Sequence, residues 1–179
     1  MTILTTQRLR LEPMDYPHLD GLHAMNSDPE VMRFILGRPE TIEETAASIE
    51  RVRTRWAAWG FSWWTFFERE SGDIVGAGCI QYLGKDEANP LEIGWRLRRD
   101  KWKLGYASEA ANAMAAYAFE VLDAELLCSI CHPDNAGSAR VMTRLGMTFK
   151  AIEQWDGSDV ALHSMTRVDW LSRRAAAGG

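Results

Sequence analysis

The sequence predicts one α/β domain built around a mixed sheet. With 179 residues, 46% of them hydrophobic, the chain is long enough to bury one sizeable core and short for two. Strand and helix patterns follow one another in the order strand, helices, three strands, helix, strand, helix and two strands, which is typical of an α/β sheet. No repeat or linker interrupts residues 1–172, and only the tail 173–179, RRAAAGG, is expected to be disordered.

The first part of the chain carries a strand, a helical region and a long amphipathic helix. Leu9 and Leu11 alternate with charged residues in QRLRLEP, which predicts a strand. Residues 15–36 are expected to be helical. Thr41 and Glu44 have the spacing of a capping box, and apolar residues then recur on one stripe up to residue 59, so a helix is predicted there.

The second part supplies most of the sheet and two further helices. Two β-rich runs between residues 61 and 83 flank the turn residues 71–73, and a third strand is expected at about 91–98. The alanine-rich segment 105–122 has only a narrow polar stripe, so we expect a helix buried against the sheet. The remaining elements are predicted in chain order as a strand ending near residue 130, a helix over 136–145 capped by Gly146, and a hairpin turning at Asp156 and Gly157.

The bulk composition argues against several classes of protein. The formal net charge of −5 argues against non-specific nucleic-acid binding as the main activity. No segment approaches the roughly 20 apolar residues of a membrane helix, and the N-terminus lacks the apolar core of a signal peptide. Cys79, Cys128 and Cys131 leave an odd thiol in any disulfide scheme, which fits a reducing compartment. We therefore expect a cytoplasmic protein with no membrane or nucleic-acid partner.

A basic loop before the buried helix is the first functional candidate. The stretch KWKLGYASEA, residues 101–110, has one glycine, Gly105, where a phosphate-binding loop usually has two or more. A strand, a short basic loop and a helix N-terminus can hold phosphate, because the first turn has unpaired N–H groups and the helix dipole favours negative charge. The alternative is an ordinary helix start. Five basic residues crowd the approach, namely Arg96, Arg98, Arg99, Lys101 and Lys103.

The segment HPDNAGSARVMTRLGMTF, residues 132–149, is the second candidate. Asn135 and Ser138 lie at the start of the predicted helix. Asn is a favoured N-cap residue, and Gly146 closes the same helix, so capping explains the pattern without any ligand. Taken by itself, this segment favours capping over binding.

Together the two segments resemble the acetyl-CoA-binding core of the GNAT acyltransferase superfamily. The ribosomal-protein N-terminal acetyltransferases of this superfamily carry the forms W-G-x-G-Y-A-x-E-A and N-x-x-S-x-x-V-x-x-x-L-G-F. The chain has the similar segments W-K-L-G-Y-A-S-E-A and, about thirty residues later, N-A-G-S-A-R-V-M-T-R-L-G-M. TQRLRLEP, NSDPEVMRFI and LEIGWRL also match that branch, so the resemblance covers nearly the whole chain. Three residues depart from the pattern: Lys103 replaces the usual first glycine of the loop, Leu104 a residue that is commonly basic or polar, and Met147 the usual Phe.

The resemblance implies a mixed, mostly antiparallel sheet that splays in the middle and is flanked by helices. The pantetheine arm of acetyl-CoA would enter between the strand of residues 92–99 and the strand that contains Cys128. The exposed edge near Leu97 and Arg99 would hydrogen-bond that arm. With Lys103 nearby, the pyrophosphate would face the backbone amides of Leu104, Gly105, Tyr106 and Ala107.

The chemistry of acyl transfer to an amine asks for a base, because an alkylamine is mostly protonated at pH 7. Glu92 is the first candidate, since some members of the superfamily place a carboxylate on this strand; a Glu in a surface salt bridge is the alternative. The resemblance also implies that Asn135 contacts the pantetheine and that Ser138 donates to the departing thiolate, with capping or cofactor contact as the alternative for Ser138. Arg140 is a weaker phosphate candidate. A backbone N–H near Leu97 could stabilise the oxyanion.

Two other patterns are weaker signals. CSICH, residues 128–132, matches the attachment motif of c-type haem, but its two cysteines would point to opposite faces of a strand and no export signal is present. With Cys79 as the only other cysteine, neither haem nor a metal is expected. Strand alternation in the aromatic stretch 56–67 sends Trp63 and Trp64 to opposite faces of the sheet. The aromatic rings on one face would pack in the core. Those on the other face would either pack in the core as well or line an acceptor cleft or a subunit interface.

The resemblance therefore implies an acetyl-CoA-dependent N-acyltransferase that transfers an acetyl group directly to a primary amine, either a protein N-terminus or a small amine, in a ternary complex. The alternative is a non-catalytic acyl-CoA-binding or sensing domain on the same fold, which would share the cofactor site and differ at Glu92 and Ser138. The sequence leaves open the identity of the amine acceptor, the length of the acyl group and the oligomeric state; a homodimer is one of the states that it allows.

Overall fold

The computed structural model describes residues 2–155 and 157–177, and its strands form one sheet in the order β1-β2-β3-β4-β5-β6-β8-β7. All neighbouring strands are antiparallel except β5 and β6, which are parallel. This arrangement confirms the predicted mixed, mostly antiparallel sheet. The strands are β1 (Leu4–Thr5), β2 (Leu9–Pro13), β3 (Trp63–Glu68), β4 (Ile74–Tyr82), β5 (Leu91–Leu97), β6 (Leu126–Cys131), β7 (Thr148–Trp155) and β8 (Ser158–Thr166).

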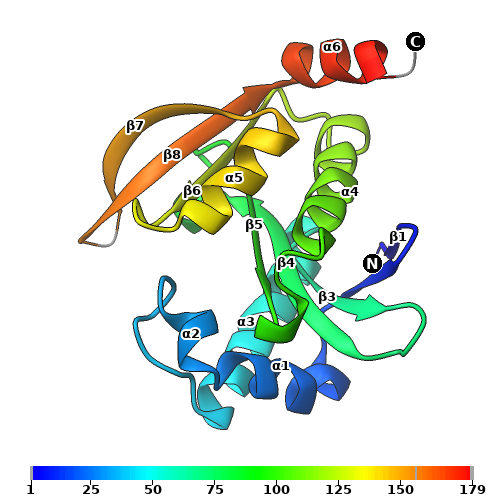
Figure 1. Cartoon of the computed structure of the whole chain (residues 1–179), viewed down its shortest axis with the longest axis vertical. Coiled ribbons are helices and arrows are strands. Elements are labelled where there is room, and N and C mark those ends of the chain that lie inside the picture. The colour runs from blue at the N-terminus through cyan, green and yellow to red at the C-terminus, as the bar shows by residue number, and fades with distance from the viewer. Residues whose placement is uncertain (1, 156, 178–179) are drawn as a thin grey trace.

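The helices lie on both faces of the sheet (Figure 1). α1, α2 and α3 gather at one end of the molecule, α4 and α5 lie beside the middle strands, and α6 lies at the opposite end. The α-helices are α1 (Leu19–Asn26), α2 (Pro29–Met32), α3 (Ile42–Trp59), α4 (Tyr106–Glu120), α5 (Ala136–Leu145) and α6 (Arg167–Ala177). Short 3-10 turns complete the chain as η1 (Tyr16–His18), η2 (Leu83–Lys85) and η3 (Arg99–Lys101).

Helix α3 begins where its capping box predicts. Thr41 Oγ1 accepts a hydrogen bond from the Glu44 N–H, and the Glu44 carboxylate accepts one from the Thr41 N–H. Gly60 ends the helix with φ 78°, a conformation that favours glycine. α3 packs with α1 on the face of the sheet that carries Thr65, where His18 Nδ1 lies 3.0 Å from Thr65 Oγ1.

Helix α4 covers the other face of the sheet and is buried as predicted. Met114 and four of its alanines, Ala110, Ala111, Ala115 and Ala118, are buried, and so are Phe66 and Ile93 of the sheet. Gly78 of β4 allows this close approach, because a Cβ there would lie 2.5 Å from Phe66 Cζ and 2.8 Å from Met114 Cε. Small residues on both elements thus bring α4 within contact of the central strands.

Three predicted boundaries need correction. The tail 173–179 was expected to be disordered, but α6 continues through residue 177, and its Arg173 donates a hydrogen bond to the Arg144 carbonyl; residues 178–179 lie outside the described residues. The strand of residues 92–99 ends at Leu97, and Arg99 begins the turn η3. The predicted helical region 15–36 divides into η1, α1 and α2, because Pro29 starts a new helix after an extended residue.

Two other elements add to this picture. β7 and β8 pair antiparallel as a hairpin, with Trp155 opposite Ser158, while the predicted turn residue Asp156 lies outside the described residues. The two-residue strand β1, which pairs with β2, was not predicted, because two residues carry no periodic signal. In the described parts of the chain, no helix combines the length and the apolar character that crossing a bilayer requires.

Candidate active site

The sheet opens at its centre, between β5 and β6. These strands pair only at Leu91 with Leu127 and at Glu92 with Cys128. At the end of this pairing, Ser129 Oγ donates a 2.8 Å hydrogen bond to the Ile93 carbonyl. The remaining residues of β5 have no strand on that side, so the predicted splay is present and its apex lies at Glu92 and Ile93.

The free edge of β5 presents a defined set of backbone groups. Antiparallel strands alternate between residues that bond their neighbour and residues whose N–H and C=O face the other way. The Arg98 N–H donates to the Val75 carbonyl in β4, so Arg98 belongs to the first set. Arg96, Gly94 and Glu92 follow it in the set that bonds β4. The residues between them, Ile93, Trp95 and Leu97, therefore turn their backbone N–H and C=O groups to the opening. The Leu97 carbonyl already accepts a 2.9 Å hydrogen bond from Trp102 Nε1, which leaves its N–H.

The loop between η3 and α4 ends at an open helix N-terminus. Gly105 is the N-cap residue of α4, and no side chain of the described residues caps this helix. The first hydrogen bond that we find in the helix runs from the Glu109 N–H to the Gly105 carbonyl. The amides of the first turn therefore remain available to an anion, as predicted for a phosphate-binding loop.

Two residues of this loop adopt left-handed backbone conformations. Gly105 has φ 87°, and Lys103 has φ 63°. A non-glycine residue in this region costs about 1–2 kcal/mol. Position 103 is thus a place where glycine would fit without strain, which explains physically why a glycine is usual there. Lys103 and its neighbours Trp102 and Leu104 are exposed.

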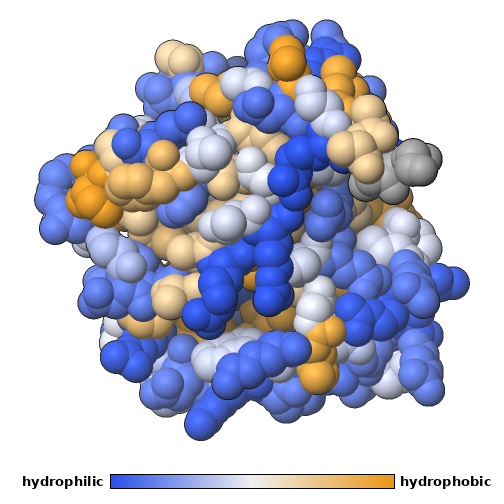
Figure 2. Space-filling model, turned by 45° about the horizontal axis from the view of Figure 1, so that its top comes forward, coloured by the Kyte–Doolittle hydropathy of each residue, from blue (hydrophilic) through white to orange (hydrophobic). Residues whose placement is uncertain are grey.

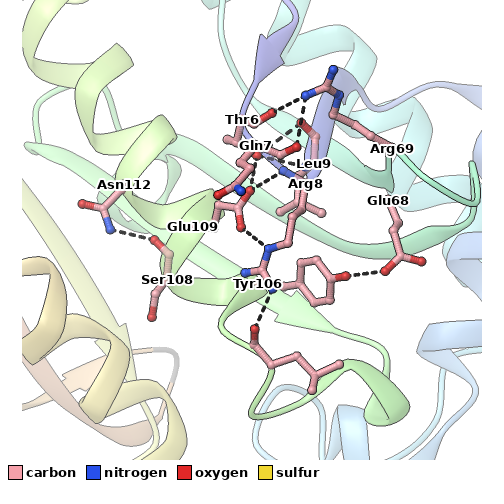
Figure 3. Close-up of polar contacts among 11 residues, drawn as sticks. Thr6, Gln7, Arg8, Leu9, Glu68, Arg69, Tyr106, Ser108, Glu109 and Asn112 are labelled. Carbon is pink, nitrogen blue, oxygen red and sulfur yellow. Dashed lines mark hydrogen bonds and ion pairs between the residues drawn. The ribbon is translucent and has the colours of Figure 1, made fainter.

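A network of polar contacts fixes the start of α4 to the turn between β1 and β2 (Figure 3). The Arg8 guanidinium donates to the Leu104 carbonyl at 2.9 Å and to Glu109 at 2.7 Å. Glu109 also accepts hydrogen bonds from Thr6 Oγ1 and from the Arg8 N–H, at 2.6 and 2.7 Å. The guanidinium carbon lies 4.4 Å from the centre of the Tyr106 ring. Both sides of Gly105 are therefore held in place.

A second group of contacts ties the loop to β3. The Glu68 carboxylate accepts hydrogen bonds from Tyr106 Oη, Lys101 Nζ and Ser71 Oγ. These donors lower the pKa of Glu68 to about 2, with the Tyr106 hydroxyl as the largest cause. Lys101 is thereby engaged by a carboxylate of the protein, and it is one of the five basic residues that the sequence placed near the phosphate loop.

Glu92 is buried at the apex of the splay. Its side chain accepts a 3.0 Å hydrogen bond from Gln81 Nε2, and burial raises its pKa above the usual carboxyl value. Burial of the Cys128 thiol, which faces Glu92 on β6, and the negative charge of Glu92 raise the pKa of that thiol to about 11, with burial as the larger cause. The alternative of a surface salt bridge is therefore wrong for Glu92.

The face of the sheet that carries Glu92 is polar around the opening. Trp63 Nε1 donates to Gln81 Oε1 at 3.2 Å, and Arg96 lies with its guanidinium carbon 5.0 Å from the centre of the Trp63 ring. Trp64, on the other face, is fully buried in the core. The aromatic stretch thus supplies both core packing and a half-buried ring beside Glu92.

Helix α5 borders the opening on the β6 side. Asn135 Oδ1 accepts a 3.0 Å hydrogen bond from the Ser138 N–H, so Asn135 caps the helix. Ser138 is half-buried, and Arg140 is exposed. The capping explanation is confirmed for Asn135, while its amide nitrogen and the Ser138 hydroxyl remain for other partners.

The segment after α2 reaches across to the start of α5. The Phe34 ring lies 5.2 Å from the ring of His132, which follows β6. Ile35 and Leu36 beside it are about half exposed, at 47% and 50%. Figure 2 shows one face of the molecule, on which a band of strongly hydrophilic residues runs between paler and apolar groups. The segment after α2 therefore contributes exposed apolar side chains next to a residue that contacts His132.

The comparisons with known proteins agree with this geometry. A family model described as an acetyltransferase (GNAT) domain matches residues 8–148. The chain belongs to the GNAT acetyltransferase family. The FsC-acetyl coenzyme A-N(2)-transacetylase of Aspergillus fumigatus is 30% identical across 94% of this chain and 77% of its own length.

Solved structures share the fold of this acetyltransferase at lower identity. A GNAT-family acetyltransferase from Bacillus anthracis superposes with a TM-score of 0.80 at 22% identity, over 93% of this chain and 99% of its own. RimL, described as a ribosomal L7/L12 α-N-protein acetyltransferase in complex with coenzyme A, superposes with a TM-score of 0.74 at 21% identity, over 92% and 98%. GNAT enzymes use acetyl-CoA as cosubstrate, and the chain is an N-acetyltransferase of this family.

The site residues predicted from the sequence lie on the loop before α4, on β5 and at the start of α5, where Asn135, Ser138 and Arg140 are found. The loop residues 103–107 lie together at the start of α4, and Glu92 and Leu97 lie on β5 beside the opening. Arg99 lies apart, on a hollow of about 570 Å³ that it shares with α1 and α2. Alternation also places Arg96 on the Glu92 face and away from the loop. The described residues contain no cluster of three or more metal-ligating side chains, and Cys79, Cys128 and Cys131 are buried free thiols.

Proposed function

We propose that this acetyltransferase transfers the acetyl group of acetyl-CoA to a primary amine by direct attack in a ternary complex. The observation that carries the proposal is the position of Glu92, a buried carboxylate of raised pKa at the apex of the opening in the sheet. In the transfer, the amine nitrogen bonds to the thioester carbonyl carbon, the carbon–sulfur bond breaks, the amine loses a proton and the CoA thiolate gains one.

The residues present fit acetyl-CoA. The uncapped first turn of α4 offers the backbone amides of Gly105, Tyr106 and Ala107, together with Leu104, to a pyrophosphate. The free edge of β5 offers the Leu97 N–H and both backbone groups of Trp95 to an extended amide-containing arm. Trp95 was not predicted from the sequence, although strand alternation from Leu97 would have identified it. Lys103 and Arg140 are exposed positive charges for the phosphates.

Glu92 is the proposed base. Its raised pKa reflects burial, which outweighs the hydrogen bond from Gln81. A carboxylate with a raised pKa is a stronger base and accepts a proton more readily from the amine. Below that pKa it holds a proton and cannot act, so kcat/KM should fall on the acid side. An α-amine, with a pKa near 8, demands less of this base than an alkylamine.

The opposite wall of the opening carries the proposed acid. Ser138 is half-buried on the first turn of α5, and its hydroxyl could donate to the departing thiolate. Asn135 caps that turn through Oδ1, and its amide nitrogen, which bonds none of the described residues, could contact the pantetheine. A backbone N–H near Leu97 would stabilise the oxyanion.

The proposal is tested by release of CoA from acetyl-CoA with a panel of amines. The panel contains alkylamines, amino acids, and peptides with free N-termini, including one with the N-terminal sequence of a ribosomal protein, since the motifs resemble that branch. We expect turnover with at least one amine, a decrease of about 100-fold or more in kcat for Glu92→Gln, and an acetyl-CoA Kd within threefold of wild type. The acid limb of the pH profile should disappear in Glu92→Gln. Ser138→Ala should lower kcat less, by about tenfold.

Two results would contradict this function. Tight acetyl-CoA binding without turnover on any amine would favour the acyl-CoA-sensing alternative. Turnover by Glu92→Gln equal to wild type near neutral pH would remove Glu92 as the base. The exposed residue Glu120 on α4 supplies a matched control, because Glu120→Gln makes the same chemical change on a surface side chain whose ion pair is with Arg174.

A further inference from the structure

We propose that the amine acceptor of this enzyme carries a carboxylate, and that Arg96 binds it. The inference rests on the proposed function and names the substrate class of the same site. It is carried by the face of β5 that holds Glu92 and by the buried Nε of Arg96, which has no hydrogen-bond partner among the described residues.

Three residues of β5 share the face that carries the base. Side chains alternate along a strand, so Glu92, Gly94 and Arg96 project to the same side. At about 3.3 Å per residue, Glu92 and Arg96 are separated by about 13 Å along the strand. Gly94 lies between them without a side chain, and a Cβ there would meet only Cys79 Sγ, at 3.4 Å. The strand therefore leaves space between a carboxylate and a guanidinium.

Arg96 lacks a hydrogen-bond partner at its inner nitrogen. Among the described residues, Nε of Arg96 is inaccessible to solvent and has no acceptor. Its guanidinium lies over the Trp63 ring, which orients the group without using any of its donors. An unpaired buried donor of a charged group is costly, and a planar carboxylate satisfies a guanidinium with two parallel hydrogen bonds.

The carboxylates around Arg96 do not supply the acceptor that its Nε lacks. Glu40 is the carboxylate that acts most strongly on Arg96, but among the described residues no hydrogen bond joins the two; Glu40 Oε2 accepts hydrogen bonds from Asn26 at 2.8 Å and from Thr45 at 3.0 Å instead. Glu92 accepts its hydrogen bond from Gln81. Desolvation by burial is the main effect on Arg96 and lowers its pKa. An anion beside the guanidinium would favour its charged form and so offset the cost of desolvation.

A second arginine favours an anion on the same side. Arg55 of α3 is half-buried, and its guanidinium lies 3.4 Å from Gln81 Oε1. Gln81 also contacts Trp63 and Glu92, so this one amide links both arginine environments to the proposed base. An acceptor with an amine at one end and a carboxylate at the other matches the order of charges along this face.

The experiment compares acceptors that differ only in the carboxylate. A series from β-alanine to 6-aminohexanoate is paired with n-alkylamines that have the same number of methylene groups, and kcat and KM are measured for each. We expect at least one amino acid to exceed its partner about tenfold or more in kcat/KM, mainly through KM. In Arg96→Gln this ratio should fall by a similar factor, and Arg96→Lys should restore part of it. Arg144→Gln, which removes an exposed arginine on α5, should keep the ratio.

The outcomes separate the inference from the function beneath it. Turnover of alkylamines equal to that of the matched amino acids by the wild type would overturn the role of Arg96 and leave amine acetylation standing. An equal loss on both acceptor types in Arg96→Gln, or a large decrease in its Tm, would show a structural role and overturn the inference. No turnover of any amine, with acetyl-CoA still bound, would overturn the proposed function and this inference with it.

Discussion

The contact between Glu109 and Arg8 should control the shape of the cofactor loop, and Glu109→Gln tests it. Glu109 accepts three hydrogen bonds, two through Oε1 from Thr6 and the Arg8 N–H, and one through Oε2 from the Arg8 guanidinium. Gln can keep the first two through its carbonyl oxygen. Its amide nitrogen would then face the guanidinium, donor against donor, so the substitution breaks the charge-assisted bond alone.

The size of the effect follows from the exposure of the two side chains. Glu109 is 17% exposed, whereas Arg8 is 41% exposed and can turn to water when its partner is lost. A charge-assisted hydrogen bond is worth about 1.5–3 kcal/mol when shielded, and solvent reduces this value. We therefore expect a loss of about 1–2 kcal/mol in the free energy of unfolding. For a chain of this length the Tm should fall by about 2–8 °C.

Acetyl-CoA affinity reports the second consequence. Arg8 also holds the Leu104 carbonyl, so a free guanidinium leaves the loop before Gly105 less ordered. We expect the Kd for acetyl-CoA, measured by calorimetry, to rise about threefold to tenfold, because binding must then order the loop. Glu120→Gln is the control on the same helix and should change stability by less than about 0.5 kcal/mol. A Tm and Kd for Glu109→Gln equal to those of that control would refute the reasoning.

Three further predictions concern the loop and the sheet. Lys103→Gly removes backbone strain of about 1 kcal/mol, but the glycine also raises the conformational entropy of the unfolded chain by a similar free energy, so the Tm should change by less than about 2 °C. The Kd for acetyl-CoA should rise a few-fold at low salt and less at high salt, because a positive charge is lost. An unchanged Kd would show that the Lys103 charge lies away from the phosphates. Glu68 has a pKa of about 2, below its ordinary value near 4.5, so its contribution to stability is present above pH 4.5 and is lost as the pH falls towards 2; Tm measured against pH should show this decline, and Glu68→Gln should flatten it. Gly78→Ala should destabilise the protein by about 1–3 kcal/mol in urea unfolding, since its Cβ would lie 2.7 Å from the Gly94 carbonyl, whereas Gly137→Ala, with its nearest atom at 3.4 Å, should be neutral or stabilising.

Local patterns in the sequence predicted most of the secondary structure, because the signals lie within a few residues. The Thr41 and Glu44 pair is both the pattern and the cap of α3, and Gly146 ends α5 with φ 103°. The small residues of α4 predicted its burial, since only such a surface can lie against the centre of a sheet. The motif resemblance added the opening between β5 and β6, which no local signal contains.

The parts that the sequence could not predict depend on contacts between distant residues. Arg8 and Glu109 are 101 positions apart, and in the sequence Glu109 is only one residue of a polar stripe. Arg96 belongs by position to a basic cluster, but strand alternation turns it to the Glu92 face. The burial of Glu92 likewise depends on the neighbours that pairing in the sheet brings to it, Gln81 of β4 and Cys128 of β6, which is a property of the packed chain.

The opening between β5 and β6 has a consequence for the mechanics of the whole sheet. It creates two strand edges inside the molecule, where the groups of Trp95 and Leu97 face a gap that α4 and α5 shield from other chains. A bound extended molecule would act there as a missing strand and couple β1–β5 to β6–β8 across the gap. Without that molecule, the two halves are joined directly only at the short pairing of Leu91 and Glu92 with β6 and at the Ser129 hydrogen bond to Ile93, so the cosubstrate would lengthen the connection between them.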